Sequence, residues 1–173
     1  DVEGHLADLQ KQELALFREA RALWQLTPAG KEAHRGELAK DAPAAVRSAI
    51  EATYPAFLDL NVEFKSLCGD WQLVDGDANR VNDHSDSAYD ARVIARLVDF
   101  DDRARPVVAA FASAHERMSP YSPRLVGSLD RLRAGDPKMF TGVMCNSYHD
   151  VWMELHEDLI LTLGIDRAAE GSF

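Results

Sequence analysis

From residue 28 onward, the hydrophobic residues of this sequence recur at the spacing of an α-helix, and no segment alternates as a β-strand does. The segment is divided by helix-start signals, each with a capping side chain close to a proline: Thr27-Pro28, Asp41-Ala42-Pro43, Ser122-Pro123 and Asp136-Pro137. Proline favours the first turn of a helix, where its missing N–H has no partner to lose. The pattern therefore predicts an all-helical bundle over residues 41–173.

The first long helix of this bundle is expected to start after Pro43. Its apolar stripe continues through Phe57 and Phe64 as far as Trp71. Pro55 lies inside that stripe and is expected to kink or divide the helix, since proline removes one backbone hydrogen bond and clashes with the preceding turn.

Further helices follow a turn-rich loop at residues 74–82. A second long helix is expected from about Asp86, bent or broken at Pro106. The last long helix is expected from about Val143 to Leu163, where Gly164 ends it.

The first 27 residues follow a different pattern. Val2, Leu6 and Leu9 repeat as one face of a short helix, but after Glu13 the apolar residues alternate. Alternation predicts two short strands with a polar turn near residues 18–21. A helix capped by Thr27 should then run to about residue 40.

The segment Leu23-Trp24-Gln25-Leu26-Thr27-Pro28-Ala29-Gly30-Lys31 resembles the junction between wing and helix in MarR- and PadR-like bacterial transcriptional regulators. In that family a strand runs into Leu-Thr-Pro-x-Gly followed by Lys or Arg. The resemblance implies a partial winged helix over residues 1–40, with a recognition helix at 1–12, a wing at about 14–26, and two more helices ahead of Asp1.

The same resemblance implies DNA contact by four residues: Lys11, Gln12, Arg18 and Arg21. In such an interface, phosphate contacts position the protein and helix side chains read the bases. The alternative is that these are ordinary solvated charges on a small helical cap.

The bundle resembles a second group of proteins. Residues 82–86 and 147–157 are similar to the helical C-terminal half of uncharacterised actinobacterial winged-helix regulators. Together, the two resemblances imply a transcriptional regulator in which residues 41–173 sense a small-molecule effector. They also imply a homodimer, because two DNA half-sites require two readers.

Charge limits where nucleic acid could bind. The net charge is −10; residues 1–40 hold six Lys/Arg and seven Asp/Glu, whereas residues 41–173 hold thirteen and twenty-two. The second part should repel DNA. No apolar run is long enough to span a bilayer, and no secretion leader is recognisable, so we expect a cytoplasmic protein with no membrane partner.

Two groups of residues could bind a ligand. His149 and His156 are seven residues apart and project within about 20° of each other on a helix, while Asp150, Glu154 and Glu157 gather on another flank. The second group is His84, Asp86 and Tyr89.

If the two groups face each other, three readings remain open. His84, His149 and His156 with a carboxylate could hold a divalent metal such as zinc, nickel, manganese or iron. The same residues, with Trp152 and Glu154, could line an organic-ligand pocket, or they could have purely structural roles.

The sequence gives no positive sign of catalysis. It holds no nucleophile elbow, phosphate loop or dinucleotide fingerprint. Cys68 and Cys145 lack metal-ligand spacing and are expected to be free thiols. The alternatives to a regulator are therefore a helical metal-binding protein or metal-dependent enzyme, and a plain interaction module.

Overall fold

The computed structural model describes residues 1–166, and the contacts within the chain divide it into two compact units, residues 1–43 and 44–173. The described residues form seven α-helices and one two-stranded antiparallel sheet, which confirms the predicted mainly α fold with a short β-ribbon. The predicted second domain ended at residue 173, and residues 167–173 lie outside the described residues. Within residues 1–166, no helix is long and apolar enough to cross a bilayer.

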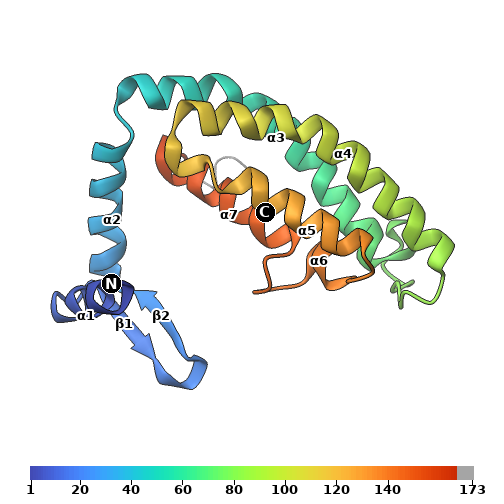
Figure 1. Cartoon of the computed structure of the whole chain (residues 1–173), viewed down its shortest axis with the longest axis horizontal. Helices are drawn as coiled ribbons and strands as arrows, with labels where there is room; N and C mark the ends of the chain where they lie inside the picture. The colour runs from blue at the N-terminus through green and yellow to red at the C-terminus, as the bar shows by residue number, and fades with distance from the viewer. Residues whose placement is uncertain (167–173) are drawn as a thin grey trace. The chain divides into compact units, whose positions relative to one another are not determined.

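The first unit is a helix, a ribbon and a second helix (Figure 1). Its elements are α1 (Val2–Lys11), β1 (Ala15–Arg18), the 3-10 turn η1 (Glu19–Arg21), β2 (Leu23–Leu26) and α2 (Pro28–Asp41). The strands are antiparallel, with Ala15 opposite Leu26 and Arg18 opposite Leu23. Ala22 closes the turn in the left-handed region, with φ 49°.

Thr27 and Gly30 join the ribbon to α2. Thr27 Oγ1 accepts the Gly30 N–H at 3.0 Å, and the same hydroxyl donates to the Glu13 carbonyl at 2.7 Å. A Cβ on Gly30 would lie 1.8 Å from the Leu14 carbonyl oxygen, so only glycine allows this approach. The Thr-Pro-x-Gly motif therefore fixes the first turn of α2 against the start of the ribbon.

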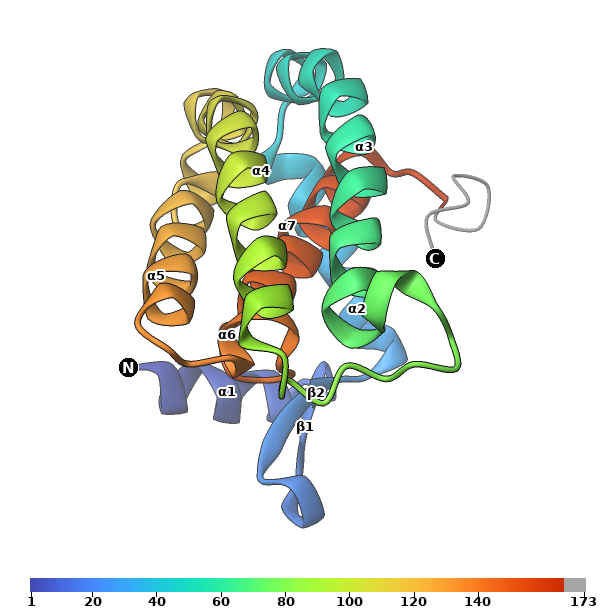
Figure 2. The ribbon, with the colours of Figure 1, turned by 90° about the vertical axis from the view of Figure 1, so that its right-hand side faces the viewer.

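The second unit is a four-helix bundle with a short extra helix. Its helices are α3 (Ala44–Gln72), α4 (Ser87–Ala114), α5 (Tyr121–Arg133), α6 (Lys138–Thr141) and α7 (Tyr148–Leu163), and the short 3-10 turns η2 (Val74–Gly76) and η3 (Glu116–Met118) lie in its connections. Contacts between α3 and α4, α4 and α5, α5 and α7, and α7 and α3 close a ring of four helices. These helices run alternately up and down (Figure 2).

Aromatic side chains fill the centre of this bundle. Trp152 is fully buried. The centroid of its ring lies 4.8 Å from the ring centroid of Phe57, 5.4 Å from that of Phe64 and 5.2 Å from that of Phe100. Burying a side chain of this size stabilises a fold by about 1.5–3 kcal/mol, before the favourable ring geometry is counted.

Pro55 and Pro106 were expected to kink or divide their helices, and neither proline divides its helix. α3 and α4 each continue past the proline. A proline inside a helix costs about 3 kcal/mol, chiefly through one lost backbone hydrogen bond. Buried residues on both sides, such as Tyr54 and Phe57 around Pro55, offset that cost.

The last helix starts later than expected, at Tyr148 and not at Val143. Met144 and Asn146 have φ values of 59° and 58°, in the left-handed region that ends or precedes a helix. Ser147 then caps α7 by accepting a backbone N–H of its first turn at 3.0 Å. The apolar pattern alone does not show these backbone conformations.

Candidate functional site

Lys11 and Gln12, two of the predicted DNA contacts, lie at the end of α1. Lys11 Nζ lies 2.9 Å from the Asp8 carboxylate, and the Gln12 side chain donates to the Asp8 carbonyl at 3.2 Å. Both side chains are exposed. Exposed pairs of this kind contribute at most about 1 kcal/mol, so these groups can exchange their partners for a ligand.

Arg18 and Arg21, the other two, lie at the far end of the ribbon. Arg18 Nε donates to the Gln25 side chain across the ribbon at 3.1 Å. Both arginines line a hollow of about 570 Å³, together with Ala20, Leu23 and Gln25. None of these lining residues is acidic, so the hollow is a concave surface with two guanidinium groups.

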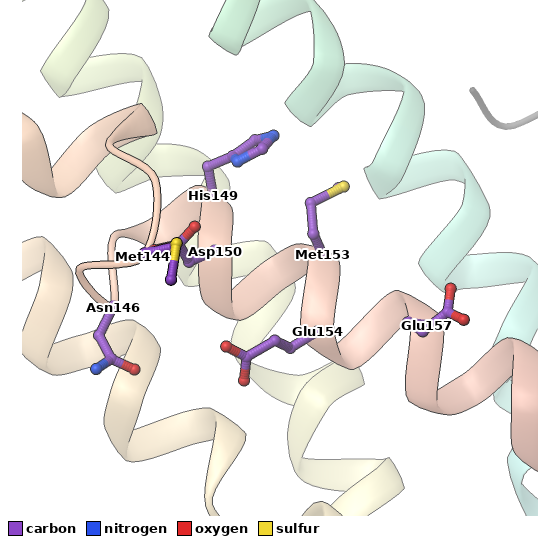
Figure 3. Close-up of a pocket in the computed structure, with 7 residues that line it drawn as sticks. All are labelled: Met144, Asn146, His149, Asp150, Met153, Glu154 and Glu157. Carbon is purple, nitrogen blue, oxygen red and sulfur yellow. The ribbon is translucent and has the colours of Figure 1, made fainter. Parts of the chain in front are cut away.

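His149 and Glu154, from the predicted ligand set, share a second concave surface, which we call the α7 groove (Figure 3). It has a volume of about 690 Å³ and is lined by Met144, Asn146, His149, Asp150, Met153, Glu154 and Glu157. Figure 3 shows His149 and Met153 projecting to one side of α7 and Glu154 to the other. Met144 and Asn146 come from the loop before the helix.

Hydrogen bonds hold the loop side of the α7 groove. Arg124 of α5 pairs with Glu154 at 2.6 Å and also donates to Asn146 at 2.7 Å. The hydrogen bond to Glu154 raises the pKa of the Arg124 guanidinium. Asp150 accepts the Cys145 backbone N–H at 2.8 Å.

Trp152 and His156, also predicted as ligand contacts, are buried in the bundle and do not line the groove. Trp152 Nε1 donates to Asn61 at 3.0 Å. His156 is 2% exposed, and its Nε2 lies 3.4 Å from the Tyr54 hydroxyl. These polar atoms meet partners inside the core, which is a structural role.

His84, Asp86 and Tyr89 lie at the connection between α3 and α4. Asp86 caps α4, accepting two backbone N–H groups at 3.0 Å, and the Tyr89 hydroxyl donates to a backbone carbonyl of α3 at 2.8 Å. His84 Nδ1 lies 3.0 Å from Asp90, and its ring packs on Trp71 at 4.5 Å. Together they order the connection.

The structure does not assemble the predicted metal shell. His84 lies at the α3–α4 connection, His149 in the α7 groove and His156 in the interior. Over the described range 1–166, no group of three or more His, Cys, Asp or Glu side chains is placed to hold a metal ion. The three histidines of the predicted shell therefore lie in three different places.

The two cysteines are free, as predicted, and both are half-buried. Burial raises the pKa of the Cys68 thiol to about 12. A thiol with such a pKa is almost entirely protonated at neutral pH, so Cys68 is a poor nucleophile.

No family model, curated protein or solved structure matches this chain.

Sequence reasoning missed part of the groove. Met153 follows His149 by four residues, so helical spacing alone could have placed both on one side of α7. Met144 and Asn146 carry no such signal, because they reach the groove through left-handed backbone conformations.

Proposed function

We propose that this chain is part of a DNA-binding transcriptional regulator and that residues 1–43 contact the DNA. The observation that carries the proposal is the ribbon end, where Arg18 and Arg21 share one concave surface. Thr27 and Gly30 hold that ribbon against α2, so the backbone that carries the two arginines is fixed in place. Arginine suits phosphate because its planar fork can donate two hydrogen bonds at once.

The other two proposed DNA contacts, Lys11 and Gln12, lie at the end of α1. Glu13 N donates to the Gln10 carbonyl and Leu14 N to the Leu9 carbonyl, each at 2.9 Å, so the helix turns directly into the ribbon. Lys11 and Gln12 thus stand beside the start of β1. Side chains of these types can donate to base edges in the major groove, while the ribbon arginines bind phosphate.

In this proposal, the bundle binds a small-molecule effector and mediates dimerisation. Its excess of acidic residues, twenty-two against thirteen basic ones over residues 41–173, keeps it off the DNA. A regulator of this kind acts in the cytoplasm as a homodimer on paired half-sites, with the bundle binding a small-molecule effector.

The test begins with the selection of bound duplexes from a random DNA library by the full-length protein. Affinity for a selected duplex is then measured by fluorescence anisotropy for the wild type and for Arg18→Ala/Arg21→Ala. The variant should bind about tenfold more weakly or worse, since it loses two phosphate contacts.

The matched control is Lys31→Ala/Arg35→Ala, which removes the same charge from exposed positions on α2. It should bind within about threefold of the wild type, because the general electrostatic attraction changes little. Equal losses in the two double variants, or no selected duplex at all, would refute the proposal.

A further inference from the structure

We draw no further inference here: the strongest candidate, the partly exposed apolar face of the ribbon that carries Phe17, Trp24 and Leu26, carries nothing because nothing in the structure of residues 1–166 shows what covers it.

Discussion

In residues 44–166 the helices bury large aromatic side chains against one another, whereas in residues 1–43 the elements are joined mainly by backbone and capping hydrogen bonds. No residue of α1 is buried, and Phe17 and Leu26 of the ribbon are 41% and 38% exposed. The comparison teaches that the bundle is stabilised by its own core. The first unit keeps its shape through local geometry and leaves apolar surface open.

Buried polar pairs in the bundle reinforce this difference. Asp101 is 1% exposed and accepts the Tyr148 hydroxyl at 2.9 Å and Arg105 Nη2 at 2.6 Å. Burial, and then the charge of Asp101, raise the pKa of the Tyr148 phenol, which keeps the hydroxyl protonated as a donor. The pair links α4 to α7 and helps to set which residues face each other.

The largest effect should come from the aromatic core. Trp152→Ala should lower the free energy of unfolding of the bundle by about 3–5 kcal/mol, because it opens a cavity and leaves Asn61 without its donor. Urea unfolding followed by circular dichroism measures the loss. Trp152→Phe keeps most of the packing and should cost clearly less. Equal costs would show that the hydrogen bond to Asn61, and not packing, dominates.

The next effect tests the first unit. Gly30→Ala should destabilise the ribbon by at least about 1–3 kcal/mol, because its Cβ would overlap the Leu14 carbonyl. Amide hydrogen exchange should show lost protection at Thr27, whose N–H donates to that carbonyl, with α3 to α7 unchanged.

Gly36 provides the control on the same helix. A Cβ there meets nothing within 4 Å, so Gly36→Ala should stabilise α2 by up to about 1 kcal/mol. If both alanine variants behave alike, the close approach of α2 to the ribbon is not what holds the first unit together.

A smaller effect should have opposite signs at two histidines of α7. His149→Phe should raise the stability by about 1 kcal/mol, because it removes a buried nitrogen that has no hydrogen-bond partner within residues 1–166. His156→Phe should lower it by about 1–3 kcal/mol, because the Tyr54 hydroxyl loses a buried contact. Thermal unfolding measures both, and a destabilised His149→Phe would show that the His149 ring makes a contribution to folding that a phenyl ring does not replace.

The smallest effect should come from a surface ion pair. The Arg103 hydrogen bond, 2.6 Å long, lowers the pKa of Glu63. A lowered folded pKa stabilises the protein above the unfolded glutamate pKa of about 4.3, and this is lost as the pH falls through the folded value. Glu63 is 39% exposed, so Glu63→Gln should cost less than about 1 kcal/mol at neutral pH. Urea unfolding at about pH 3 should show a smaller difference.

Much of the fold could be predicted from the sequence, since its signals are local. Thr27 caps α2 where the Thr-Pro dipeptide indicated, and alternating residues on either side of the turn form the ribbon. Tyr54 was missed, although it continues the stripe from Ile50 to Phe57 at helical spacing. Asn61 follows Phe57 by four residues and therefore lies on the same apolar stripe. A polar residue at such a position could have indicated a buried hydrogen bond.

The candidate sites were harder to predict, because they depend on which elements meet. His149 and His156 share one helix, yet one lines a groove and the other lies in the core. His84 lies in a loop, and its hydrogen bond with Asp90 cannot be predicted from hydrophobic periodicity. Proximity between distant segments is set by packing, and a single sequence does not record it.

The most direct test of the proposed DNA contact is the salt dependence of affinity for a selected duplex. Each phosphate contact contributes about 0.9 to the slope of log affinity against log salt. Arg18→Ala/Arg21→Ala should therefore reduce the slope by about 2 relative to the wild type, while Lys31→Ala/Arg35→Ala should leave it unchanged. Equal slopes of log affinity against log salt for the wild type and for Arg18→Ala/Arg21→Ala would contradict DNA binding by the ribbon.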